Sequence, residues 1–249
     1  MKRNRSQGWT YAKLSGHKNE SLVSEELGDG YYTLAGKVES IFGDKTTPKP
    51  DIYGVKRHSL KKSLSGQVHM NKVGRFLDGY TIMYGEIPSN VSKVFLLLFG
   101  GSDIIDEVLS CEDCIHQNPK VRATEVRRKT ITTETLIKYN EDLSNEFKLW
   151  FKDNLHNITE LVFKKGWSKN EGDWVDILWY VNKLGDNQVN EKFDINEIIE
   201  KSKGRDVIYG TKNGGTTIQL PFGHLQFHQG GLQFHHNYEK IKELISERK

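Results

Sequence analysis

The 249-residue chain contains few residues that crosslink or interrupt a fold: two cysteines, Cys111 and Cys114, and five prolines. Two cysteines give no disulfide framework, and one C-x-x-C pair supplies at most half of a tetrahedral zinc site. We therefore expect both to be reduced cysteines in a connecting segment. No apolar run reaches membrane-spanning length, and no apolar segment follows the basic N-terminus as in a secretory signal. These absences predict a cytoplasmic protein without a membrane partner.

Neither sign of charge dominates the sequence. Lysine and arginine number 36 against 33 aspartates and glutamates, which gives a formal net charge of +3. A polyanion-binding protein of this kind has to concentrate its positive charge on one face. Hydrophobic residues make up 36% of the chain, enough for a packed core. No linker separates two parts of the chain, so we predict a single domain over residues 1–249.

Residues 50–62 predict a β-hairpin that carries reactive side chains. Asp51 leads the first strand, a short basic turn follows, and Ser59, Leu60 and Lys61 lie in the second strand. Because side chains alternate along a strand, Ser59 and Lys61 share one face, where Asp51 can stand beside Lys61. A carboxylate and an ammonium so placed suit a hard divalent cation and an attacking water. The alternative is a solvated surface hairpin with a basic turn.

The residues Pro50, Asp51, Ser59 and Lys61 resemble the motif of the PD-(D/E)XK nuclease superfamily, which is best known from type II restriction endonucleases. Seven residues separate Asp51 from Ser59, which is within the loose range of the superfamily. Ser59 stands where the superfamily usually has Asp or Glu, so one expected metal ligand is missing. Some members with a non-acidic residue there take a carboxylate from elsewhere in the chain.

Two glutamates are candidates for that carboxylate. Glu20 lies early in a helix that we expect to begin at Ser15 and to end at Gly28. Members of the superfamily often open their core with a helix whose glutamate faces the metal site. The alternative is an acid that the helix dipole favours near the N-terminus. Glu39, in a segment predicted to form one or two strands over residues 31–42, is the second candidate.

The resemblance implies a magnesium-dependent endonuclease of double-stranded DNA, as in a restriction-modification system, that leaves 5′-phosphate and 3′-hydroxyl ends. Asp51, Glu20 and the carbonyl of Leu60 are the expected Mg²⁺ ligands. Lys61 is expected to orient or help deprotonate the attacking water and to stabilise the anionic transition state. Ser59 completes the motif at the position of the missing acid.

Gln67 is the last member of the predicted catalytic set. It follows the catalytic strand at the start of an amphipathic helix predicted over residues 67–80. At that helix N-terminus its side chain would contact the metal-bound water or a phosphate.

The C-terminal quarter predicts antiparallel strands over residues 206–211, 216–220, 223–228 and 231–236. One face of the last two strands is apolar, and the other carries glutamines and histidines. A β-ribbon fits the major groove, where such side chains read base edges. A metal site made by the histidines, or a face packed on another part of the protein, are the alternatives. The expected DNA-binding residues are Lys62, Lys212, Asn213, Gln219, His224, Gln226, His228, Gln233 and His235.

The sequence thus predicts an α/β fold with a central mixed β-sheet flanked by helices. Residues 1–110 are expected to form the catalytic core, 111–205 a mainly helical part, and 206–249 a β-hairpin recognition region. Two other functions stay open: a structure-specific repair or junction nuclease, and a non-catalytic DNA-binding protein, for which Ser59 is the main argument. The resemblance does not decide whether one chain or a homodimer acts.

Overall fold

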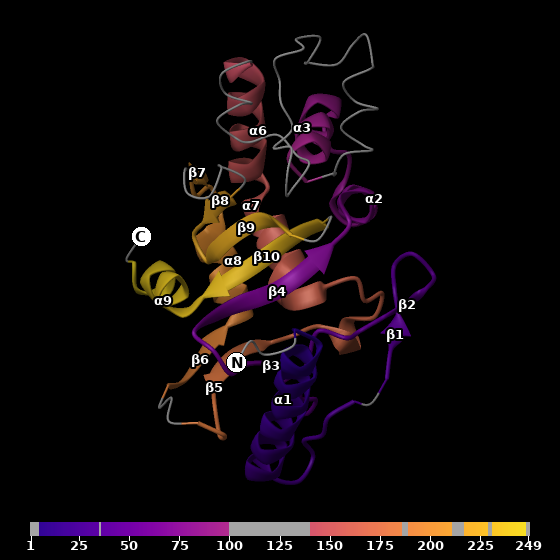
Figure 1. Cartoon of the computed structure of the whole chain (residues 1–249), viewed down its shortest axis with the longest axis vertical. Helices are drawn as coiled ribbons and strands as arrows, with labels where there is room; N and C mark the ends of the chain where they lie inside the picture. The colour runs from indigo at the N-terminus through magenta and orange to yellow at the C-terminus, as the bar shows by residue number, and fades with distance from the viewer. Residues whose placement is uncertain are drawn as a thin grey trace. The chain divides into compact units, whose positions relative to one another are not determined.

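A computed structural model of the chain describes residues 5–34, 36–99, 140–185, 189–210, 217–228 and 231–247. These residues form helices and three β-sheets (Figure 1), so the predicted α/β class is confirmed at this level. The single central sheet that we predicted is replaced, within the described ranges, by separate sheets of two, three and five strands. None of the described helices combines the length and the apolarity needed to cross a membrane.

Contacts divide the chain into two compact units, each built from two separate stretches. Unit 1 comprises Met1–Leu64 and Phe163–Ile198, and unit 2 comprises Ser65–Val162 and Ile199–Lys249. The boundary after Leu64 falls inside the predicted catalytic core of residues 1–110. The predicted single domain is not tested by this division and stays a prediction.

Unit 1 is built around a mixed three-stranded sheet. Strand β3 (His58–Lys61) runs parallel to β5 (Ile177–Val181), and β5 runs antiparallel to β6 (Asn190–Asp194). The other elements of this unit are the helix α1 (Arg5–Leu27), the strands β1 (Val38–Glu39) and β2 (Lys45–Thr46), the 3₁₀ helix η2 (Glu171–Asp173), the end of the π-helix η1 (Glu160–Lys165) and the start of α8 (Ile195–Ser202).

The core of unit 1 lies directly beside the residues of the predicted catalytic set. Val23 follows Glu20 by one turn of α1, Ile52 follows Asp51, and Leu60 separates Ser59 from Lys61. Burying each such large apolar side chain stabilises the fold by about 1.5–3 kcal/mol. Burial of the apolar neighbours therefore holds the polar residues in place. The core cluster consists of Val23, Ile52, Leu60, Ile177, Trp179 and Val181.

Helix α1 begins at Arg5, so the predicted start at Ser15 is wrong. The helix continues through Gly16, because a single interior glycine costs only about 1 kcal/mol. Ser15 is therefore no N-cap, and its Oγ instead accepts a hydrogen bond from Lys62 Nζ. The predicted end is confirmed: Gly28 has a φ of 83°, and its N–H donates to the Ser24 carbonyl at 3.2 Å.

Unit 2 contains a five-stranded antiparallel sheet in the order β4-β10-β9-β8-β7, in which Figure 1 shows β4, β10 and β9 as neighbouring arrows. Its strands are β4 (Ser65–Asn71), β7 (Ile208–Gly210), β8 (Thr217–Leu220), β9 (Gly223–His228) and β10 (Gly231–Asn237). Its helices are α2 (Val73–Tyr84), α3 (Ser89–Phe99), α6 (Glu141–Asp153), α7 (Leu155–Thr159) and α9 (Tyr238–Ser246).

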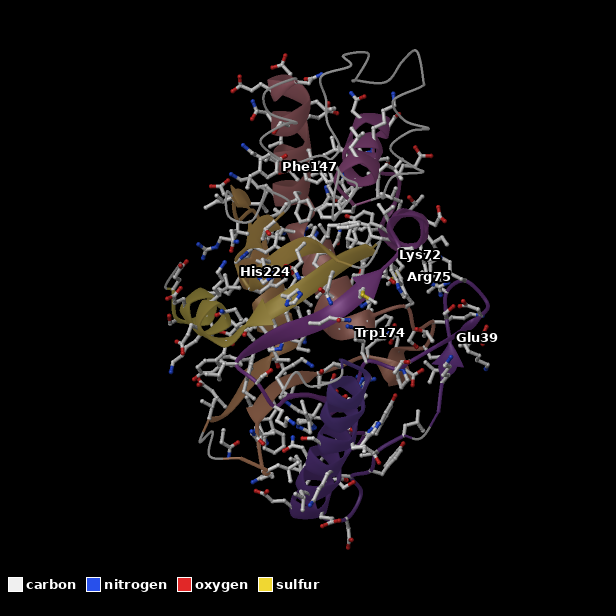
Figure 2. The ribbon with its side chains drawn as sticks, in the orientation of Figure 1. Glu39, Lys72, Arg75, Phe147, Trp174 and His224 are labelled. Carbon is white, nitrogen blue, oxygen red and sulfur yellow. The ribbon has the colours of Figure 1, made fainter. Side chains whose placement is uncertain are left out.

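Aromatic side chains join these helices to the sheet. The ring of Phe95 on α3 lies 4.9 Å from that of Phe147 on α6, which Figure 2 labels, and 5.2 Å from that of Phe76 on α2. Phe76 in turn lies 5.9 Å from Phe234 on β10. All four residues are fully buried, so this chain of rings covers one face of the five-stranded sheet.

Several predicted elements differ from the structure. Residues 65–71 form a strand, and α2 begins only at Val73, so the helix predicted from Gln67 is wrong there. Pairing of β4 with β10 overrides the local helical spacing. Among the described residues of 31–42, only Val38–Glu39 form a strand, with isolated bridges at Tyr32 and Ser40. The strands β8, β9 and β10 agree with the predictions, whereas α9 was not expected.

Candidate functional site

A narrow hairpin turn brings Asp51 to β3. The backbone N–H groups of Asp51 and Ile52 donate to the His58 carbonyl at 2.8 and 3.1 Å, and His58 N–H donates back to Ile52 at 2.9 Å. This closure lays the Asp51 carboxylate across the strand, where its Oδ2 accepts a hydrogen bond from Leu60 N–H at 2.6 Å. The other carboxylate oxygen, Oδ1, accepts no hydrogen bond within the described residues.

Ser59 links Asp51 to Lys61. Its Oγ donates to Asp51 Oδ2 at 3.3 Å and accepts from Lys61 Nζ at 2.8 Å. The same ammonium donates to the Leu60 carbonyl at 3.1 Å. Asp51 and Lys61 therefore share one face of the strand. Burial lowers the pKa of Lys61, and the negative charges of Asp51 and Glu20 oppose that change.

Glu20 on α1 lies within electrostatic reach of both residues. Burial raises its pKa, and the charge of Asp51 raises it further. His17, whose Nδ1 lies 3.0 Å from Glu20 Oε2, and the more distant Lys61 act in the opposite direction. Glu20 and Asp51 are thus neighbouring carboxylates that repel each other, which is the condition a bound cation relieves.

Both carboxylates line one hollow of unit 1, which has a volume of about 540 Å³. Other polar side chains in its wall are His17, Ser21, Thr33, Lys37 and Thr47. Hydroxyl groups and a lysine around two carboxylates suit a polar, charged ligand rather than an apolar one.

Two sets of hydrogen bonds between residues far apart in the sequence hold α1, β3 and β5 together. Asp176, just before β5, accepts from the Arg57 backbone N–H at 2.8 Å and from its Nε and Nη2 at 2.9 Å each. On α1, the buried amide of Asn19 donates to the Val181 carbonyl at 3.2 Å and accepts from Lys183 N–H at 2.7 Å. Sequence reasoning missed Asn19, although it directly precedes Glu20.

The second glutamate candidate lies in a different environment. Glu39 Oε1 forms an exposed ion pair with Lys169 Nζ at 3.0 Å, and Figure 2 labels this residue on β1. The hydrogen bond and charge of Lys169 lower the pKa of Glu39. Of the two candidates, Glu20 is the one whose pKa is raised by the charge of Asp51.

The oxygen donors at this place fit a magnesium ion. Asp51 Oδ1, the Glu20 carboxylate and the Leu60 carbonyl are hard ligands, and Mg²⁺ in proteins uses one or two carboxylates while it keeps several waters. The described residues contain no cluster of three or more His, Cys, Asp and Glu side chains that could hold a metal ion. The mutual repulsion of Glu20 and Asp51 supports the fit.

A hydrogen-bonded group of glutamines and histidines lies on one face of β4, β9 and β10 in unit 2. We call Gln67, His224, Gln226, Gln233 and His235 the Gln/His face. Gln233 joins three strands, because its Nε2 donates to Gln67 on β4 and its Oε1 accepts from Gln226 Nε2 on β9 at 3.1 Å. Gln233 is only 5% exposed, whereas Gln67 at the end of the row is exposed.

The two histidines of this face stack on each other. Their rings are 4.4 Å apart and inclined by 12°, and His235 Nε2 also lies 2.9 Å from Gln233 Oε1. Burial and the charge of Lys240 lower the pKa of His224, which favours the neutral form of this ring. Figure 2 labels His224 on β9.

The remaining predicted residues lie in several places. Gln67 belongs to β4 and the Gln/His face, not to a helix N-terminus, because residues 65–71 pair with β10. Lys62 Nζ donates to Ser15 on α1, and Gln219 Oε1 accepts from Lys240 Nζ at 2.9 Å. Outside the described residues or side chains lie Lys212, Asn213, Cys111, Cys114 and the side chain of His228.

Sequence reasoning also missed Lys49, two residues before Asp51. Burial lowers its pKa to about 7, and the charge of Lys61 acts in the same direction.

A comparison with protein-family models and a search of curated proteins both find no match to this chain. Function therefore has to be argued from the geometry of the two sites.

Proposed function

We propose that the chain is a magnesium-dependent endonuclease of double-stranded DNA that resembles type II restriction enzymes, with its catalytic site in unit 1. The observation that carries this proposal is the link from Asp51 through Ser59 to Lys61, with hydrogen bonds of 3.3 and 2.8 Å. The mixed sheet of β3, β5 and β6, with α1 presenting Glu20, supports the finer proposal of a restriction-endonuclease-like core.

In this proposal, each residue of the site has a distinct task in attack of water on a phosphodiester. Lys61 Nζ uses two of its N–H groups on Ser59 and the Leu60 carbonyl, which leaves the third to orient the attacking water. Asp51 is fixed by the Leu60 N–H, so one carboxylate oxygen keeps a constant direction. Because Ser59 Oγ hydrogen-bonds to both Asp51 and Lys61, it fixes the positions of these two side chains relative to each other.

The magnesium ion would be held by Asp51, Glu20 and the Leu60 carbonyl. When bound, it neutralises charge on the reacting phosphate and lowers the pKa of a coordinated water. The Ser59 hydroxyl does not replace the acid of the motif as a ligand in this scheme. Glu20 fills that role from α1, where Asp51 already raises its pKa.

The Gln/His face is the proposed reader of base edges in the major groove. Its side chains are uncharged donors and acceptors on adjacent antiparallel strands, as such reading requires. The internal hydrogen bonds of Gln233 orient Gln67 and Gln226, so Gln233 is a positioning residue of this face. Gln67, at its exposed end, is the proposed base contact.

A cutting assay on a mixed-sequence plasmid with Mg²⁺ tests this function. Discrete bands are the expected result and support sequence-specific cleavage. Nicks confined to branched or looped substrates would support a repair or junction nuclease instead. A gel shift without any cut over a range of Mg²⁺ concentrations would support a DNA-binding protein without catalysis, in agreement with the serine at position 59.

A further inference from the structure

An exposed aromatic ring lies next to the hollow that Asp51 and Glu20 line. Tyr32 is 54% exposed, and the two residues that follow it, Thr33 and Leu34, are part of the wall of that hollow. Because consecutive Cα atoms are about 3.8 Å apart, the Cα of Tyr32 lies within about 8 Å of that of Leu34. The tasks proposed above leave this ring without a role.

Tyr53, in the hairpin that carries Asp51, supports one face of the Tyr32 ring. The two rings are stacked, with centroids 5.6 Å apart and planes inclined by 17°. Tyr53 is itself buried, and its hydroxyl donates a hydrogen bond to Oδ1 of the buried Asp173 at 3.1 Å. The supporting ring is therefore fixed, and the exposure of Tyr32 belongs to the edge and the opposite face of its ring.

Backbone contacts fix Tyr32 as well. Its N–H donates to the Tyr53 carbonyl at 3.0 Å, and the Tyr53 N–H donates back to the Tyr32 carbonyl at 2.8 Å. The ring of the preceding Tyr31 packs on Gly54, where an added Cβ atom would lie 2.3 Å from Tyr31 Cδ1. Since the ring is already held in place, Tyr32 loses little conformational freedom when a flat ligand stacks on it.

A flat ring with one supported and one open face suits a planar ligand. Nucleobases are the planar groups of the proposed substrate, and bases stack on aromatic side chains in many proteins that bind unpaired strands. The neighbouring hollow has Lys37 and two carboxylates in its wall, so it suits the sugar-phosphate part of a nucleotide. A base inside an intact duplex is covered by its neighbours, so only an unpaired or extruded base can reach the ring.

We propose that Tyr32 stacks on an unpaired base of DNA that lies beside the phosphate bound near Asp51 and Glu20. This inference rests on the proposed nuclease function and narrows its substrate. The preferred DNA is a duplex in which one base beside the cut phosphate is unstacked, either because it has no partner or because the protein extrudes it.

The test uses the full-length chain in EDTA, where no Mg²⁺-dependent cleavage occurs. Its affinity is measured for a fully paired duplex and for the same duplex with one additional unpaired base. Wild type is compared with Tyr32→Ala, with Tyr32→Phe and with Ile82→Ala, which removes another exposed apolar side chain, on α2. The readout is the ratio of the two affinities, because a purely structural defect weakens the binding of both duplexes alike.

We expect wild type to prefer the duplex with the unpaired base by about tenfold, since the cost of unstacking is then smallest. Tyr32→Ala should lose this preference, whereas Tyr32→Phe, which keeps the ring, and Ile82→Ala should retain it. Equal affinity of wild type for both duplexes would overturn the inference, as would a preference that persists in Tyr32→Ala. Loss of the preference in Tyr32→Phe would overturn it too, because the hydroxyl and not the ring would then bind DNA.

A second measurement needs no variant. The unpaired base is replaced by 2-aminopurine, whose fluorescence is quenched when the base stacks on an aromatic ring. Binding of wild type should lower the fluorescence, and an unchanged or increased signal contradicts the inference.

The outcomes for the two proposals are distinguishable. A chain that cuts plasmid DNA but shows no preference for the unpaired base is a nuclease without this stacking site. A chain that shows the preference but never cuts with Mg²⁺ has the stacking site without the nuclease function. A chain that binds neither duplex overturns both proposals.

Discussion

The catalytic site proposed in unit 1 and the Gln/His face of unit 2 differ in how their polar groups are satisfied. In unit 1, charges converge: Asp51 and Glu20 repel each other, and Lys61 is buried against its preference. In unit 2, neutral groups satisfy one another, and Gln233 bonds to neighbours on both sides. Converging charges of both signs are typical of sites that bind a polar ligand, whereas a network of hydrogen-bonded amides is typical of a surface of fixed shape.

The largest effect should come from Asp51→Asn. An asparagine can still accept the Leu60 N–H through its amide oxygen, so the hairpin should persist. Loss of the carboxylate should slow Mg²⁺-dependent cleavage by about a thousandfold, because one charged ligand of the reacting centre disappears. Gel shifts should show DNA affinity close to that of the wild type. Loss of folding, seen by circular dichroism, would instead make Asp51 a structural residue.

Asn19→Ala should have the next largest effect, this time on stability. Its amide joins α1 to the end of β5 and is 2% exposed, so the change leaves the Lys183 N–H and the Val181 carbonyl without this partner. The expected loss is about 2–3 kcal/mol in the free energy of unfolding, measured in urea. Cleavage should also slow, because α1 carries Glu20. Normal stability would show that the core packing alone positions this helix.

Within the Gln/His face, Gln233→Ala and Gln67→Ala form a matched pair. The buried Gln233 orients two neighbours, so its loss should cost about 1–2 kcal/mol of stability. Removal of the exposed Gln67 side chain should lower the free energy of unfolding by less than about 0.5 kcal/mol. If Gln67 reads a base, its loss should nevertheless relax the preferred cutting sequence. Equal cleavage patterns for Gln67→Ala and wild type would remove it from base reading.

A smaller loss of stability than for Asn19→Ala is expected for Asp176→Asn, and it should depend on pH. Burial raises the pKa of Asp176, but the hydrogen bonds from Arg57 outweigh this and lower it below the ordinary 3.8. A carboxyl with a lowered folded pKa contributes stability above its unfolded pKa and loses that contribution as pH falls through its folded pKa. The variant should therefore be less stable by about 1 kcal/mol at neutral pH.

As pH falls below 3.8 and then through the lowered folded pKa of Asp176, the difference between Asp176→Asn and wild type should shrink, since the carboxyl becomes protonated and loses its charge. Urea unfolding at several pH values measures it. A difference that stays constant into this acidic range would mean that the Arg57 contact does not depend on the charge of Asp176.

The sequence allowed the pairing of Asp51 with Lys61 to be predicted, because strand alternation and the spacing to Ser59 are local properties. It also predicted the strands that carry His224 and His235. Gln67 was placed wrongly, since its helical spacing yields to pairing with β10, far away in the sequence. Asn19 escaped prediction because its role comes from contacts with a distant segment, at Val181 and Lys183.

Single-turnover cleavage by Lys61→Ala, Asp51→Asn and the double variant tests most directly whether these two residues act as one unit. Residues that act together are strongly non-additive, so the double variant should be about as slow as the slower single variant. The circular dichroism spectra of all three should match that of the wild type. Cleavage by Lys61→Ala at the wild-type rate would contradict this prediction. A double variant whose cleavage rate falls by the product of the two single decreases would contradict it as well.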